Sequence, residues 1–141
     1  MNIVVSDPKT RKAYSLNIER PVFLGKKIGD TVELDIIGLK GYKAIITGGS
    51  DKDGFPMKAS IQGTIRRKVL LGKGVGYRAK APGIMKRKRI RGNTIAEDIH
   101  QVNLKITEYG AEELDKIFKK DEKSSEGKAP EGGKEKVKEK E

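Results

Sequence analysis

The sequence predicts a mainly β protein: a small β-barrel-like domain, then one C-terminal helix and a disordered charged tail. Up to Tyr109, short runs of alternating apolar and polar residues recur between Gly, Pro and Asp turns, a pattern typical of an all-β barrel or sandwich. From Asp121 onward the chain is Lys, Glu, Gly, Ser and Pro with almost nothing to bury. The length of 141 residues favours one domain with tails.

In the first half of the chain, strands are predicted where apolar, often β-branched residues alternate with polar ones between turn residues. Pro8 and its neighbours between the first two runs predict a closely linked strand pair. Later, Val32, Leu34 and Ile36 share one face and are expected to point inward. The expected strands are 2–5, 11–18, 22–24, 31–37 and 42–47.

In the second half, 61–71 is long enough for a strand, with Gly63 indicating a bulge or close backbone approach. Four glycines and a proline make 72–83 an irregular loop. A strand is expected at 86–91, and another at 100–107 with Val102, Leu104 and Ile106 on one face.

A single helix is expected near the C-terminus. Leu114, Ile117 and Phe118 are spaced at i, i+3 and i+4, with acids in the first turn and lysines in the last. The expected division is therefore a β domain over 1–109, a helix over 110–120 and a tail over 121–141.

The charge distribution points to a polyanionic partner. The formal net charge is +11, from 31 Lys and Arg against 20 Asp and Glu. Residues 1–57 carry 9 basic and 7 acidic residues, 58–92 carry 12 and 0, and 93–141 carry 10 and 13. The middle stretch has no acid of its own, so its cations must face water or a bound anion.

RNA is the expected anion, contacted through its phosphate backbone and shape rather than its base sequence. Successive cations at 86–89 cannot face a core on either side of a strand. The glycines let backbone amides approach a phosphate. Tyr77 either stacks on a base or packs within the protein. The predicted RNA-binding residues are Lys58, Arg66, Arg67, Lys68, Lys73, Arg78, Lys80, Lys86, Arg87, Lys88, Arg89 and Arg91.

The chemistry-bearing residues do not predict an enzyme. There is no cysteine, and the only histidine is His100, inside an expected strand, so no catalytic residue or metal site is expected. The glycines at 72–76 do not open a helix, which argues against a nucleotide pocket and a cofactor. Asp51 and Asp53 precede Gly54 as in part of a calcium loop, but the later Glu ligand is missing.

Nothing in the sequence predicts a membrane segment or an export signal. The apolar run at the N-terminus is short, and no stretch approaches the roughly 20 apolar residues of a membrane span. A cytoplasmic protein with neither a membrane nor a small-molecule partner is expected.

One segment carries a specific resemblance. Ile46 to Met57, ITGGSDKDGFPM, fits the pattern apolar, small, Gly, Gly, any, Asp, two free, Gly, any, Pro, Met at every fixed position. It resembles the signature of the archaeal and eukaryotic small-subunit ribosomal protein S6e family, which is distinct from the bacterial protein of the same number. Residues 41–43, 72–74, 77–78, 89–92 and 103–104 also resemble that family, so the likeness spans about 1–109.

The resemblance implies a small β-barrel that is a structural part of the small ribosomal subunit, in the cytoplasm, with ribosomal RNA and neighbouring ribosomal proteins as partners. Eukaryotic members carry a long basic helix and a phosphorylated serine cluster, whereas this tail has only Ser124 and Ser125, so that regulation is not expected. The signature is expected to form a rigid corner through Gly48, Gly49, Asp51, Gly54, Pro56 and Met57.

Two other classes stay open at the level of sequence. One is a free-standing RNA-binding or RNA-chaperone barrel, which would have the same surface chemistry but act away from ribosomal particles. The other is an enzyme or a metal-binding module that uses Asp51 and Asp53.

Overall fold

The computed structural model describes residues 1–110, 114, 117 and 118. The chain divides into two units, Met1–Ala111 and Glu112–Glu141. The helix expected at 110–120 and the tail expected at 121–141 lie almost entirely outside the described residues. No helix among the described residues is long and apolar enough to cross a membrane.

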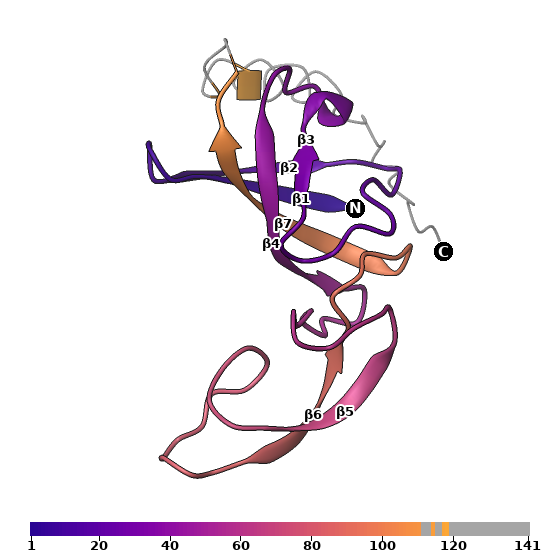
Figure 1. Cartoon of the computed structure of the whole chain (residues 1–141), viewed down its shortest axis with the longest axis vertical. Helices are drawn as coiled ribbons and strands as arrows, with labels where there is room; N and C mark the ends of the chain where they lie inside the picture. The colour runs from indigo at the N-terminus through magenta and orange to yellow at the C-terminus, as the bar shows by residue number, and fades with distance from the viewer. Residues whose placement is uncertain (111–113, 115–116, 119–141) are drawn as a thin grey trace, which may run out of the picture. The chain divides into compact units, whose positions relative to one another are not determined.

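The first unit is mainly β, as predicted, and contains two separate sheets (Figure 1). One has five strands in the order β2-β1-β7-β4-β3, in which β1 and β7 are parallel and the other neighbours antiparallel. The strands are β1 (Asn2–Asp7), β2 (Lys12–Asn17), β3 (Thr31–Glu33), β4 (Lys43–Asp51) and β7 (Ile99–Glu108). The other is an antiparallel pair of β5 (Arg66–Leu71) and β6 (Lys86–Arg91).

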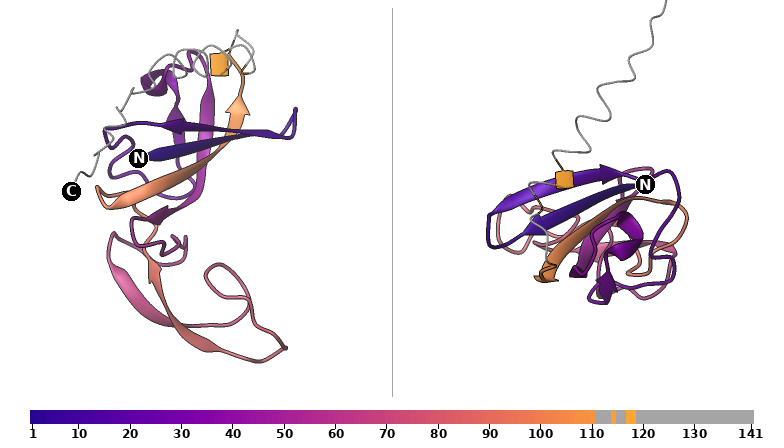
Figure 2. Two further views of the ribbon diagram at one scale, coloured as in Figure 1. Left: turned by 180° about the vertical axis from the view of Figure 1, so that it is seen from behind. Right: turned by 90° about the horizontal axis from the view of Figure 1, so that it is seen from above.

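The expected barrel is not formed. The five-stranded sheet is open, because its outer strands β2 and β3 have no ladder between them in the described part of the chain. A barrel strand must bury one of its faces, but Lys86–Arg89 of β6 are all exposed. The two basic strands form a ladder with each other and, apart from a bridge between Met57 and Arg91, with nothing else in the described residues. They make an arm that projects from the sheet (Figures 1 and 2).

The core lies on one face of the five-stranded sheet. Ile3 and Val5 alternate inward on β1, and Val102, Leu104 and Ile106 are buried on β7 as predicted. Ala44 and Ile46 contribute from β4, with the register Ile46↔Leu104 placing core residues opposite each other.

Two strand predictions in the first half are wrong. Phe23 has φ 61°, a left-handed conformation that a strand does not accommodate, and 22–24 is not a strand. β3 stops at Glu33, since Asp35–Ile37 form a 3-10 turn that ends at Gly38 with φ 89°. Val32 and Leu34 are buried as expected, but that turn leaves Ile36 71% exposed.

Candidate nucleic-acid interface

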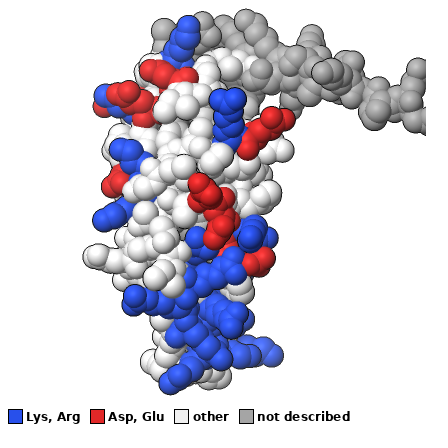
Figure 3. Space-filling model, turned by 90° about the vertical axis from the view of Figure 1, so that its right-hand side faces the viewer, with Lys and Arg blue, Asp and Glu red and all other residues white. Residues whose placement is uncertain are grey.

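The structure gathers most of the predicted cations on one arm, residues 66–91, called here the basic hairpin (Figure 3). It consists of β5, β6 and the loop 72–85 between them. The register pairs Arg66 with Arg91 and Lys68 with Arg89, so like charges lie directly opposite each other. Such pairs repel and destabilise an isolated hairpin unless anions neutralise them.

Ten of the twelve predicted cations form no ion pair with any acid of the described residues. Four of them, Lys86 to Arg89, are consecutive and exposed. Lys58 is the least exposed of the ten, and Nζ of Lys88 lies 5.9 Å from the ring centroid of half-buried Tyr77. The ten are Lys58, Arg67, Lys68, Lys73, Arg78, Lys80, Lys86, Arg87, Lys88 and Arg89.

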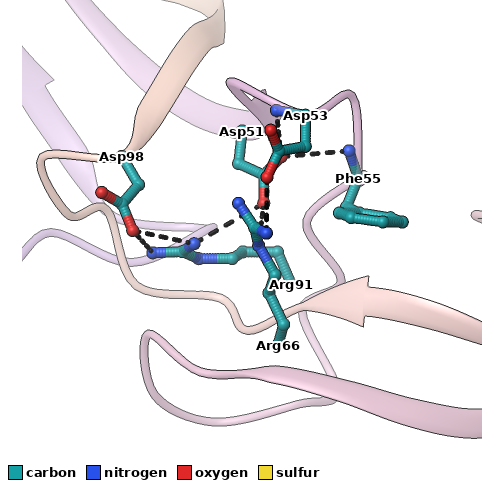
Figure 4. Close-up of polar contacts among 6 residues, drawn as sticks. All are labelled: Asp51, Asp53, Phe55, Arg66, Arg91 and Asp98. Carbon is teal, nitrogen blue, oxygen red and sulfur yellow. Dashed lines mark hydrogen bonds and ion pairs between the residues drawn. The ribbon is translucent and has the colours of Figure 1, made fainter.

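Arg66 and Arg91 differ from the other ten, because both bind carboxylates of the same chain (Figure 4). Nε of Arg66 lies 2.6 Å from Oδ2 of Asp51, and its Nη1 lies 2.5 Å from Asp53. Nη1 of Arg91 lies 3.5 Å from the same Asp51 oxygen and 3.4 Å from Asp98. Arg91 is only 4% exposed. We call these five residues the junction cluster.

Asp51 is the centre of the junction cluster. Its side chain is fully buried, and its Oδ1 accepts the backbone N–H groups of Asp53 at 2.9 Å and Phe55 at 3.2 Å. Burial raises the pKa of Asp51, but these N–H groups and Arg66 outweigh that effect and hold the pKa below its ordinary value. The residue is therefore a carboxylate in the folded protein at neutral pH.

The segment that follows Asp51 turns back onto the sheet and then onto the hairpin. Met57 donates its N–H to the carbonyl of Gly49 at 2.9 Å, and Pro56 accepts the N–H of Arg91 at 3.0 Å. Lys58 in turn donates to the carbonyl of Arg91 at 3.1 Å. The segment thus joins the end of β4 to the end of β6.

Gly49 is required by close packing rather than by its dihedral angles. A Cβ at this position would lie 2.3 Å from the carbonyl oxygen of Gln101 on β7 and 3.2 Å from the sulfur of Met57. The sequence suggested that these glycines begin a loop, but they do not. Gly48 and Gly49 lie within β4 and pair with Asn103 and Val102 of β7. Only Gly54, with φ 80°, occupies a true turn conformation.

Sequence reasoning missed two residues of this region. Asp98 precedes β7 and contacts Arg91, yet no local pattern distinguishes it from an ordinary surface acid. Asn93 is 9% exposed, donates to the carbonyl of Ala59 at 3.3 Å and accepts the N–H of Gly63 at 3.3 Å. Asn93 thereby fixes the segment that leads into β5.

Asp51 and Asp53, the residues of the partial calcium pattern, both contact Arg66. A cation of the protein itself therefore occupies the position that a metal ion would need. In the described residues, no group of three or more His, Asp or Glu side chains could hold a metal.

Comparison with known proteins identifies the family. Residues 1–119 match the family model of ribosomal protein S6e. The chain belongs to the S6e family. Among its relatives, the small ribosomal subunit protein eS6 of Methanocella arvoryzae is 46% identical over 134 residues, covering 91% of this chain and 94% of that protein.

Two further S6e proteins show similar likeness. The small ribosomal subunit protein eS6 of Methanocaldococcus jannaschii is 45% identical over 115 residues, covering 82% of this chain and 88% of that protein. The protein of the same name from Archaeoglobus fulgidus is 44% identical over 124 residues, covering 85% and 96%.

The residues that carry the S6e signature are those that join the sheet to the basic hairpin. Gly49 allows β4 to approach β7, Asp51 binds both arginines at the hairpin base, and Pro56 and Met57 pair with the end of β6. The signature therefore builds the attachment of the basic hairpin rather than its charged surface.

Proposed function

We propose that this chain is a structural constituent of the small ribosomal subunit, in the cytoplasm, and that its basic hairpin binds ribosomal RNA. The subunit assignment is supported by the S6e relatives, which are named small ribosomal subunit proteins. A structural role is proposed rather than catalysis, with ribosomal RNA and neighbouring ribosomal proteins as partners.

The observation that carries the RNA-binding proposal is the set of ten cations without an ion pair to any acid of the described residues. Asp51, Asp53 and Asp98 neutralise the pair Arg66 and Arg91, but Lys68 faces Arg89 across β5 and β6 without such an acid, and this repulsion is relieved when an anion lies against the hairpin. A phosphate backbone supplies closely spaced negative charges, and its counterions are released on binding. Contacts of this kind fix position and orientation without reading sequence.

The geometry narrows the proposed contact set. Arg66 and Arg91 are engaged by Asp51, Asp53 and Asp98, so we assign them to the attachment of the hairpin. The ten other cations are proposed to contact RNA. Tyr77 is half-buried and lies close to Lys88, so its ring is expected to pack at the hairpin rather than to stack on a base.

The test combines binding with particle association. In a titration of ribosomal RNA, alanine at Lys86, Arg87, Lys88 and Arg89 should weaken binding and lower the salt dependence by roughly three units of log–log slope. The matched control is alanine at Arg20, Lys26, Lys27 and Lys40, four exposed cations outside the hairpin. An equal loss of RNA affinity in the two quadruple variants would mean that binding depends on net charge alone and not on the hairpin.

Particle association distinguishes the ribosomal role from a free-standing RNA-binding protein. In a density gradient of cell lysate at high salt, the tagged wild-type chain should migrate with small subunits, and the hairpin variant should shift to the top. If the wild-type chain stays at the top while purified protein binds RNA, the chain is a free-standing RNA-binding protein.

A further inference from the structure

Exposed apolar side chains concentrate in the acid-free segment 58–92 that carries the predicted RNA-binding cations. Seven large hydrophobic side chains are exposed in the described part of the chain, and five of them lie between residues 58 and 92. These five are Ile65, Leu70, Val75, Ile84 and Met85. Phosphate contacts alone do not account for them, because an ionic surface gains nothing from exposed hydrocarbon.

Two of these side chains border a groove in the loop between β5 and β6. The groove has a volume of about 450 Å³, within the range of small-molecule sites. Its lining is largely apolar, from Ala79, Ala81, Pro82, Ile84 and Met85, and also includes Lys73 and Lys80. The segment holds no acid, and neither lysine has an ion pair among the described residues.

We propose that this groove receives an unstacked nucleobase from a single-stranded or looped RNA, while Lys73 and Lys80 bind the adjoining phosphates. The inference rests on the proposed RNA-binding function and adds a requirement for accessible bases. A single strand presents an apolar base face beside a phosphate, matching the pairing of apolar lining and cations. A continuous duplex hides its base faces in the stack and satisfies only the lysines.

The test compares two RNA probes on the full chain: a short uridine oligomer and a blunt RNA duplex of the same length. The variant carries Ile84→Ser and Met85→Ser, which removes apolar surface and leaves every charge in place. The control carries Leu24→Ser and Ile36→Ser, since these side chains are 48% and 71% exposed outside the hairpin. Circular dichroism and thermal unfolding check that all three proteins fold alike.

The groove variant should bind the uridine oligomer about fivefold more weakly, with an unchanged salt slope, because two partly buried apolar contacts are lost but no charge is. Its affinity for the duplex should match that of the wild type, and the control should match on both probes. Replacing the same two residues by leucine, which stays apolar, should restore binding to the oligomer.

Other outcomes overturn the inference. Equal losses on both probes, or no loss on either, would show that the groove holds no base, although salt-dependent binding would leave the proposed function intact. A separate sedimentation assay with phosphatidylserine vesicles tests a lipid partner. If the wild type sediments with the vesicles and the groove variant does not, while the variant keeps its RNA affinity, the groove is assigned to a lipid surface. Absence of salt-dependent binding to either RNA by the wild type would instead overturn the proposed function itself.

Discussion

Asp51 and Arg66 lie 15 positions apart in sequence, and their side chains meet at 2.6 Å where the basic hairpin leaves the five-stranded sheet. The carboxylate is fully buried, and the guanidinium is 29% exposed. Asp51 also lies 3.5 Å from Arg91 on the opposite strand of the hairpin, so one acid contacts both strands. One buried carboxylate at the end of β4 therefore links both strands of the hairpin to the sheet.

Replacing Asp51 with Asn should destabilise the first unit by about 2–4 kcal/mol, because it removes the buried carboxylate that Arg66 and the buried Arg91 share. The amide oxygen can still accept the N–H groups of Asp53 and Phe55, so the loss isolates the charge. Urea unfolding measures the loss in the free energy of unfolding. The control is Asp53→Asn, whose carboxylate is half-exposed and should matter less. Equal losses in both variants would contradict a central role for Asp51.

Stability should fall in acid because of two carboxylates, Asp51 and Asp7. Burial raises the pKa of Asp7, but Tyr109, Thr10 and the N–H of Lys9 outweigh it, so both acids have a pKa below the ordinary value of 3.8. Below that value the unfolded chain binds protons that the folded chain does not. The stabilisation is complete above the unfolded pKa and is lost as pH falls through the lower folded pKa.

Thermal unfolding from about pH 7 down to about pH 2 should therefore show a melting temperature that declines below about pH 4. Asp51→Asn should start lower at neutral pH and decline less steeply, since one of the linked protons is gone. A wild-type curve parallel to that of the variant would show that Asp51 does not have a depressed pKa.

Gly49 and Gly48 offer a matched pair of neighbouring positions. A methyl group at Gly49 meets the backbone oxygen of Gln101 at 2.3 Å, whereas one at Gly48 meets nothing within 4 Å. Gly49→Ala should cost about 1–3 kcal/mol through overpacking between β4 and β7. Gly48→Ala should be neutral or slightly stabilising, since it restricts the unfolded chain. Chemical denaturation of both variants checks the difference, and similar losses would contradict it.

Sequence periodicity located most strands because their inward faces alternate, as at Val102, Leu104 and Ile106. It could not predict that β1 pairs in parallel with β7, since that ladder joins Ile3 to Val102 across nearly the whole domain. Nor could it predict the open sheet, since alternation describes one strand and not the closure of a set. Ile36 follows the same alternation, yet the 3-10 turn exposes it.

The sequence predicts the surplus of positive charge at the candidate interface, but not which cations are exposed and which pair with acids. Twelve cations without an acid stand out in the sequence, and consecutive exposed charges at 86–89 follow from strand geometry. That Arg91 is buried while Arg89 is exposed depends on Asp51 and Asp98, which arrive from outside the acid-free segment. Local sequence does not contain such long-range pairing.

Arg66 and Arg67 provide the sharpest test of the distinction between cations that attach the hairpin and cations that contact RNA. They are adjacent on β5 and point to opposite faces. Arg66 binds Asp51 and Asp53, whereas Arg67 is exposed and has no ion pair among the described residues. Arg67→Ala should lower the log–log salt slope of RNA binding by about 0.7–0.9 and leave the urea midpoint unchanged. Arg66→Ala should lower the midpoint and change the slope much less. An equal drop in slope for the two variants would mean that Arg66 leaves its carboxylates to contact phosphate when RNA binds, and the junction cluster would then be part of the interface rather than its support.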